Sequence, residues 1–119
     1  SGEWQYGYKE SIKYVESVQN KYDEVRITSA LGRPYIYYLF FTKTEPKDFR
    51  ETAIIKHDPF GFVTISGFSK YRFADNLSSM RGAKKVLYID SPARVHPKGD
   101  VLKRFYLLNG SGIITAYRL

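Results

Sequence analysis

The sequence predicts a small α/β single domain with a mixed β-sheet, an N-terminal helix–strand–helix unit and a C-terminal antiparallel hairpin. Near the N-terminus, apolar residues recur at helical spacing and then switch to the alternation of a strand. A Gly-Arg-Pro turn then opens a strongly aromatic stretch. The second half consists of short apolar runs separated by Asn, Gly and Pro, which indicates several short strands. At 119 residues, we expect residues 1–119 to form one core.

The first helix is expected over residues 8–22, with residues 3–8 as a lead-in before it. Its apolar positions are separated by three or four residues and therefore share one helix face: Tyr8, Ile12, Val15, Val18 and Tyr22. A short strand over residues 23–29 follows, where Val25 and Ile27 alternate with polar residues. An early strand–helix unit of this kind favours a mixed sheet whose faces are covered by helices.

The chain is organised around residues 22–43, which hold this strand, the turn at Gly32 and an aromatic helix. Pro34 has a fixed φ that suits the first turn of that helix. Residues 35–41 are all apolar or aromatic, but the run is far shorter than the roughly 20 residues that span a bilayer. We therefore expect the helix to be buried by the rest of the domain or by a partner.

A shorter helix is expected over residues 46–53, with Thr44 as its cap and Phe49 as its inward anchor. The remaining predictions are a loop at 57–61, strands at 62–66 and 68–75 separated by a break or bulge at Gly67, a turn or short helix at 76–83, a strand at 84–90, a loop at 91–99, and strands at 101–108 and 113–119. The continuous apolar run in 84–90 predicts a central strand covered on both faces. The Asn-Gly-Ser-Gly sequence at 109–112 predicts the turn of the final hairpin.

The net charge of +7 arises entirely in the second half of the chain. Residues 1–60 hold nine Lys/Arg and nine Asp/Glu, whereas residues 61–119 hold ten and three. A one-sided basic surface attracts phosphates, nucleic acid or anionic lipid head groups. The candidate contacts with an anion or a membrane surface are Lys70, Arg72, Lys84, Lys85, Lys103 and Arg104.

Motifs for catalysis are scarce. The chain has no Cys, and its two histidines, His57 and His96, lie in separate Pro-containing loops without ligand spacing. No nucleophile elbow and no phosphate-binding glycine motif occurs. Asp75 and Asp90 each end a predicted strand, where turn residues are common. We therefore predict no catalytic residue, cofactor or metal site, while a small hydrolase that uses Asp75, Asp90 or His96 stays an open alternative.

A basic module that binds nucleic acid or another anionic polymer is the main alternative function. Aromatic residues alternate with the candidate cations, and aromatic side chains on a basic sheet can stack bases. The aromatic motif of RNA-binding sheets is absent, which argues against nucleic acid as the partner. Alternation of charged and aromatic residues is also typical of a strand with one solvated and one buried face.

Several short motifs in order carry a resemblance to a known family. They are W-x-Y-G-Y-K-E-x-I-x-Y-V (4–15), Y-D-x-V-x-I-T (22–28), G-R-P-Y-I-Y-x-L-F-x-T-K (32–43), E-P-K-D-F (45–49), G-F-x-K-Y-x-F-x-D (67–75) and L-Y-I (87–89), followed by the closing hairpin. Together they resemble the extracytoplasmic C-terminal domain of prokaryotic membrane glycosyltransferases similar to dolichyl-phosphate-mannose protein mannosyltransferases. The resemblance extends over almost the whole chain.

The resemblance implies a multi-spanning enzyme that uses a polyprenyl-phosphate sugar, whose catalytic acidic residue lies in an early loop with no counterpart here. The chain would be a non-catalytic accessory domain at the extracytoplasmic face of the membrane, and Ser1-Gly2 would be a cleavage scar on a piece of a larger protein. Its partners would be the membrane-embedded portion of the same polypeptide, anionic lipid head groups, and an acceptor glycan or peptide. The residues that match the family motifs are interpreted as fold determinants: Tyr8, Gly32, Pro34, Tyr35, Gly67, Tyr71, Phe73 and Asp75.

Overall fold

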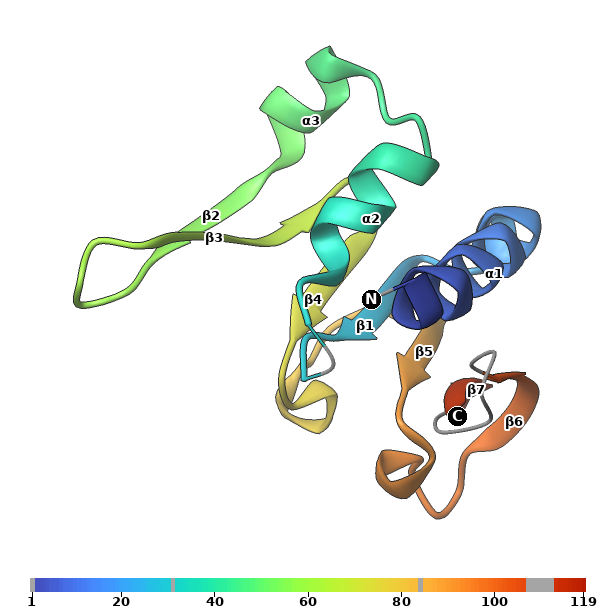
Figure 1. The fold of residues 1–119 in the computed structure, drawn as a ribbon. Helices are drawn as coiled ribbons and strands as arrows, with labels where there is room; N and C mark the ends of the chain where they lie inside the picture. The colour runs from blue at the N-terminus through green and yellow to red at the C-terminus, as the bar shows by residue number, and fades with distance from the viewer. Residues whose placement is uncertain (1, 31, 84, 107–112) are drawn as a thin grey trace.

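The computed structural model describes residues 2–30, 32–83, 85–106 and 113–119 (Figure 1). Within them, seven strands form one mixed sheet in the order β2-β3-β4-β1-β5-β7-β6. The helices are α1 (Gly2–Val18), α2 (Pro34–Phe41) and α3 (Pro46–Thr52), with single 3-10 turns η1 (Gln19–Lys21), η2 (Leu77–Ser79) and η3 (Pro92–Arg94). The strands are β1 (Glu24–Thr28), β2 (Ile54–His57), β3 (Val63–Phe68), β4 (Tyr71–Ala74), β5 (Val86–Asp90), β6 (Asp100–Tyr106) and β7 (Ile113–Arg118). The predicted α/β class with a mixed sheet is confirmed.

The centre of the sheet is a parallel trio in which β1 lies between β4 and β5, with Ile27 opposite both Phe73 and Ile89. From β1 the chain goes out to one side of the sheet to build β2–β4, and it then returns to the other side for β5. A reversal of this kind leaves a crevice beyond the carboxyl ends of the strands, which is where open α/β sheets bind their ligands. Here those ends are Thr28, Ala74 and Asp90.

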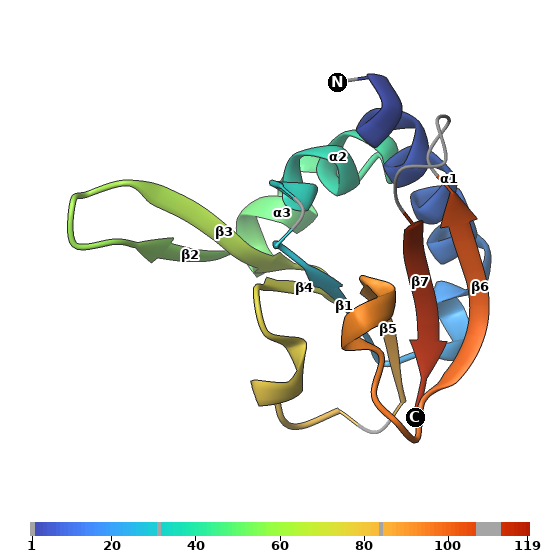
Figure 2. The same ribbon diagram turned by 60° about the horizontal axis from the view of Figure 1, so that its bottom comes forward.

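The main core lies between the sheet and the helices, all of which cover the same face (Figure 2). Ile12 and Val15 of α1 are fully buried, as the helical spacing predicts. Tyr38 of α2 is completely inaccessible, and its ring centroid lies 5.5 Å from that of Tyr71. Phe49 of α3 packs against Phe68 at 5.6 Å, which confirms its predicted role as an inward anchor. Among the described residues, no α-helix lies on the opposite face of the sheet. The prediction that helices cover both faces is therefore wrong, and the segments around η2 and η3 cover the second face.

Several predicted boundaries are corrected by the structure. Helix α1 begins at Gly2 rather than at residue 8, because an interior Gly7 costs a helix only about 1 kcal/mol. Thr44 does not cap α3, whose N-cap is Glu45; the Thr44 hydroxyl lies 2.8 Å from that of Thr42 instead. Phe68 ends β3 rather than starting the next strand, because the chain reverses at Ser69, where φ is +51°.

Gly67 does not break the strand, since β3 runs through it. A Cβ at Gly67 would lie 2.9 Å from Cδ of its cross-strand neighbour Arg72, so the glycine permits close approach of two strands. The register shifts directly beside it, because Ile54 pairs with Gly67 and Ile55 with Ile65, which leaves Ser66 as an extra residue in β3 and agrees with the predicted bulge.

The aromatic helix α2 is buried only in part. Pro34 and Tyr38 are buried, whereas Ile36 is 49% and Phe40 74% exposed. A short helix on a sheet turns a single face inward, so a run that is apolar all round must leave some side chains outside. Strand β5 is central and buried on both faces as predicted, although it begins at Val86. Strands β6 and β7 form the predicted antiparallel hairpin, whose turn at 109–112 falls outside the described residues.

Candidate functional site

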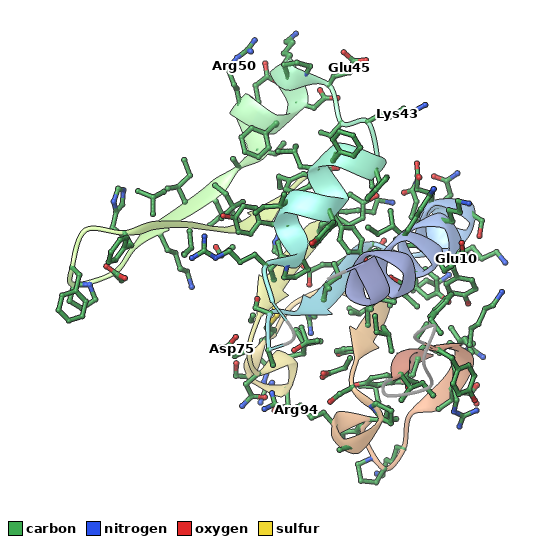
Figure 3. The ribbon with its side chains drawn as sticks, viewed as in Figure 1. Glu10, Lys43, Glu45, Arg50, Asp75 and Arg94 are labelled. Atoms are coloured by element: carbon green, nitrogen blue, oxygen red, sulfur yellow. The ribbon has the colours of Figure 1, made fainter. Side chains whose placement is uncertain are left out.

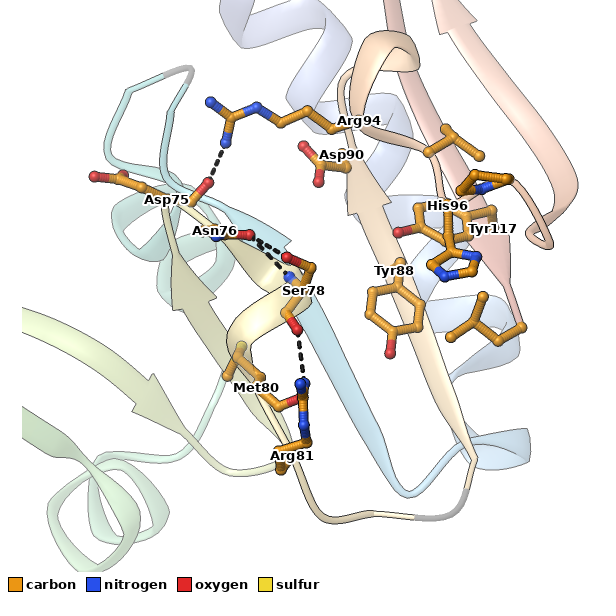
Figure 4. Close-up of a pocket in the computed structure, with 13 residues that line it drawn as sticks. Asp75, Asn76, Ser78, Met80, Arg81, Tyr88, Asp90, Arg94, His96 and Tyr117 are labelled. Atoms are coloured by element: carbon orange, nitrogen blue, oxygen red, sulfur yellow. Dashed lines mark hydrogen bonds between the residues drawn. The ribbon is translucent and has the colours of Figure 1, made fainter.

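The face of the sheet without helices carries two adjoining cavities. The first, of 730 Å³, is called the open-face cavity, and it is lined by Asp75, Asn76, Ser78, Met80, Arg81, Tyr88, Asp90, Arg94, Val95, His96, Pro97, Tyr117 and Leu119 (Figure 4). The second, of 600 Å³, is called the basic cavity, and it is lined by Lys21, Tyr22, Arg26, Met80, Arg81, Gly82, Ala83, Lys85, Val86, Tyr88, Arg118 and Leu119. The two share Met80, Arg81, Tyr88 and Leu119 and therefore adjoin. The pair is called the depression; it extends from the carboxyl ends of the parallel strands, at Asp90, to their amino ends, at Lys85.

Two stacked tyrosines make the wall of the open-face cavity. Tyr88 of β5 and Tyr117 of β7 are cross-strand partners. The centroids of their rings are 4.8 Å apart, and the ring planes differ by 11°. Burial raises the pKa of the Tyr117 hydroxyl, although a backbone hydrogen bond from His96 opposes the rise. The hydroxyl is therefore neutral near pH 7 and can donate a hydrogen bond. A Cβ on Gly99 would lie 2.8 Å from the Tyr117 ring, so this loop can press against the ring only with glycine at that position.

Arg26 lines the basic cavity and ties the segment around η2 to the central strand. The residue is 2% exposed, and its guanidinium donates to Glu24 Oε2 at 2.6 Å and to Tyr88 Oη at 3.2 Å. It also donates to three backbone carbonyls of the loop after η2, those of Met80 at 3.3 Å, Arg81 at 3.3 Å and Gly82 at 3.0 Å. One buried cation therefore fixes the shape of the loop that both cavities share.

Asp90 is a buried carboxyl group at the carboxyl end of β5. It is 3% exposed, accepts from the backbone N–H of Ser91 at 2.8 Å, and is hydrogen-bonded to the Thr28 side chain. Thr115, the cross-strand partner of Asp90, is 1% exposed. The Thr115 hydroxyl has no hydrogen-bond partner among the described residues. Burial is the largest influence on Asp90 and raises its pKa, while Ser91, Arg94 and Thr28 act in the opposite direction.

The raised pKa of Asp90 predicts a pH-dependent effect of the substitution Asp90→Asn. The folded chain holds the Asp90 proton more tightly than the unfolded chain, so this stabilisation is present below the ordinary pKa of 3.8 and lost as the pH rises through the folded value. We therefore expect Asp90→Asn to be more stable than the wild type at neutral pH, with a gap that closes below pH 3.8. Urea unfolding midpoints across this range measure the gap. The control Asp100→Asn replaces an exposed carboxylate and should show no such gap. Equal midpoints for the wild type and Asp90→Asn at all pH values would contradict the expectation.

Three residues that the sequence offered for hydrolytic chemistry, Asp75, Asp90 and His96, all line the open-face cavity. Their functional groups do not converge: the carboxylate of Asp75 points away from Asp90, as Figure 4 shows. The backbone carbonyl of Asp75 instead accepts a hydrogen bond from Arg94, which holds η3 beside the end of β4 (Figure 3). The Nδ1 atom of His96 accepts from the backbone N–H of Lys98 at 3.0 Å, and the second histidine, His57, lies on β2 at the far edge of the sheet.

The basic cavity is lined by five cationic side chains and by no side-chain carboxylate: Lys21, Arg26, Arg81, Lys85 and Arg118. Two of them pair with carboxylates outside the lining, Arg26 with Glu24 and Arg118 with Asp100. Arg26 is fully engaged, and Arg81 donates to the carbonyls of Ser78 and Met80. Lys21 and Lys85 are exposed, and among the described residues no carboxylate pairs with either ammonium group. Like charges held together in this way create a positive potential that attracts an anion.

Of the six cations proposed from the sequence, the five that the structure describes do not gather on one patch. Lys70 donates to the carbonyls of Gln19 and Tyr22, and Arg72 pairs with Glu24 at 3.5 Å, so both bond within the domain. Lys103 and Arg104 lie on β6, the edge strand on the other side of the sheet. Lys85 lines the basic cavity, and Lys84 falls outside the described residues.

The sequence-based reasoning did not identify Arg26, Arg81, Tyr88 or Tyr117 as site residues. A signal for Arg26 was present, because an arginine in a strand that is covered on both faces must find partners for its charge. For the other three, the site depends on which loop folds over which strand, and local sequence patterns do not reveal this.

Comparisons with known proteins provide no identification: no family model, no curated protein and no solved structure matches this chain. Within the described ranges, no helix is both long and apolar enough to cross a membrane. In the same part of the chain, no three His, Asp or Glu side chains gather closely enough to hold a metal ion.

Proposed function

We propose that this chain is a non-catalytic accessory domain of a membrane glycosyltransferase that takes its sugar from a polyprenyl-phosphate donor. The observation that supports this most directly is the depression, in which a cation-lined cavity adjoins a cavity with an aromatic wall. The phosphate-sugar end of such a donor carries its negative charge beside a hydroxyl-rich ring. The two halves of the depression are suited to these two parts.

The basic cavity provides charge for the phosphate. Arg81 and Lys85 lie at its opening and carry exposed cationic groups. Phosphate oxygens accept charge-assisted hydrogen bonds from Arg and Lys, which are roughly twice as strong as neutral ones. Arg26 is paired with Glu24 and donates to groups of the protein, so it shapes the cavity rather than binding the phosphate.

The open-face cavity provides surfaces for a sugar. Pockets for small ligands combine apolar or aromatic walls with a few polar groups that fix orientation. Tyr88 and Tyr117 form such a wall, and Asp90, Arg94 and Asn76 provide acceptors and donors around it. In this proposal the domain lies at the extracytoplasmic face, holds the phosphate-sugar end, and leaves bond making and breaking to the membrane-embedded portion of the same polypeptide.

The alternative of a module for nucleic acid or another anionic polymer is not favoured by any described surface. A polymer with a charged backbone is bound through many phosphate contacts along its length. The described cations of the sequence-based set instead lie on β4, at the start of β5 and on β6, and Lys70 and Arg72 bond internally.

The proposal is tested by calorimetric titration of the chain with farnesyl monophosphate, a short polyprenyl phosphate, and with farnesol as the matched alcohol. We expect binding of the phosphate that weakens with added salt, and no comparable binding of the alcohol. Incubation with radiolabelled polyprenyl-phosphate mannose and an acceptor peptide should leave the label on the donor. Transfer by this chain alone, or equal affinity for farnesol and its phosphate, would overturn the proposal.

A further inference from the structure

The hairpin formed by β2 and β3 projects well beyond the rest of the domain (Figure 1, Figure 2). Its far end carries the most exposed large apolar side chain in the described part of the chain, Phe60, at 86%, together with Phe62 at 69%. Val63 and Ile55 continue this apolar surface along the arm, at 53% exposure each. Two phenylalanines at the tip of a projecting arm are unfavourable in water unless another phase or partner receives them.

The tip also satisfies its own backbone donors. Asp58 Oδ1 accepts from the N–H groups of Phe60 at 2.8 Å and Phe62 at 2.9 Å. The N–H of Asp58 donates to the carbonyl of Phe62 at 2.9 Å, and that of Gly61 donates to Asp58 at 3.0 Å. Pro59 has no N–H, so every amide donor from 58 to 62 is paired inside the turn. Gly61 allows this compact turn because its φ is +86°.

We infer that this tip, residues 58–62, inserts into the interface of a phospholipid bilayer. Unpaired backbone donors are costly away from water, and a turn that pairs all of them is already adapted to a layer of low polarity. The tip is convex and ends in aromatic rings, which suits a deformable lipid surface. Asp58 is the sole carboxylate between residues 53 and 74, and it already accepts hydrogen bonds from two backbone amides. Lys56, which is exposed, is attracted to anionic head groups.

The inference does not depend on which ligand the cavities hold. It places the membrane contact on the hairpin rather than on the cations proposed from the sequence. Apolar insertion persists on uncharged lipid and at high salt, whereas attraction between lysines and anionic head groups is lost under both conditions. The two modes of contact are therefore separable by experiment.

The test is co-sedimentation with phosphatidylcholine vesicles, with and without phosphatidylglycerol and without any polyprenyl phosphate. We expect Phe60→Ser/Phe62→Ser to lower the partition coefficient by about tenfold or more on both lipids, because each phenylalanine loses its burial in the interface. The matched control is Phe40→Ser, which removes another exposed phenylalanine, 74% accessible on α2, and should leave partitioning unchanged. Because all three side chains are exposed, circular dichroism and unfolding midpoints should match those of the wild type.

A fluorescence measurement places the tip relative to the bilayer. Trp4 is the single tryptophan of the chain, so Trp4→Phe/Phe60→Trp carries one reporter at the tip. On vesicles we expect a blue shift of its emission and quenching by brominated acyl chains. Absence of vesicle binding, equal loss in the Phe40→Ser control, or binding without quenching would each overturn the inference. Such results would point instead to a protein partner or a second copy of the chain as the occupant of the tip.

Discussion

The substitution Arg26→Met should lower the free energy of unfolding by about 3–5 kcal/mol, because removing one partner of a buried ion pair leaves the other charge buried and unpaired. The side chain is 3% exposed and donates to five oxygen atoms. Its loss leaves Glu24 with only the longer contact to Arg72, at 3.5 Å, and leaves three carbonyls of the loop after η2 without this donor. Urea unfolding followed by circular dichroism measures the change.

Arg72→Met is a matched control for this prediction. Arg72 pairs with the same Glu24, but its side chain is 27% exposed and the pair is longer. Partly exposed ion pairs contribute at most about 1 kcal/mol, so this variant should lose far less stability. Hydrogen exchange should also quicken in residues 80–83 of Arg26→Met and not in the control. Equal stability losses in the two variants would show that Arg26 does not hold the loop.

The second large effect is expected at the opening of the basic cavity. Arg81→Glu/Lys85→Glu reverses two exposed charges where the proposal places the phosphate. Replacing attraction by repulsion should weaken binding of farnesyl monophosphate at least tenfold, since like charges brought together cost several kcal/mol. Calorimetry at low salt measures this loss.

The matched control for the cavity is Lys103→Glu/Arg104→Glu, which makes the same change in net charge on β6. Long-range attraction by overall charge would respond equally to both double variants, whereas a local site would respond only to the first. Equal weakening in the two variants would therefore contradict a phosphate site at Arg81 and Lys85. The unfolding midpoint of each variant shows whether the fold is retained.

The sequence was sufficient to predict those elements whose pattern is local. Helix α1 buries Ile12 and Val15 as the helical spacing requires, and Pro34 begins α2 as its fixed φ suggests. Strand β5 is central because its apolar run has no polar face. The start of α1 was placed too late, because the apolar spacing that located the helix begins only at Tyr8.

The site was less accessible to sequence reasoning because it is built from non-local contacts. Arg26 was read as part of the polar face of a strand, and only the cover provided by the loop after η2 makes it a buried anchor. Lys70 and Arg72 were grouped with Lys85 because they share a charge, although the fold directs the first two inward to internal partners. Strand order decides such questions, and the sequence did not specify it.

The account is tested most directly by mapping amide chemical shifts of the isotopically labelled chain during titration with farnesyl monophosphate. We expect the largest changes at residues 80–83, at Lys85 and at Tyr88, which line the basic cavity, and weaker changes at Tyr117. Shifts confined to β6, or spread evenly over all cationic residues, would contradict the proposal that this depression receives the phosphate end of a lipid-linked sugar.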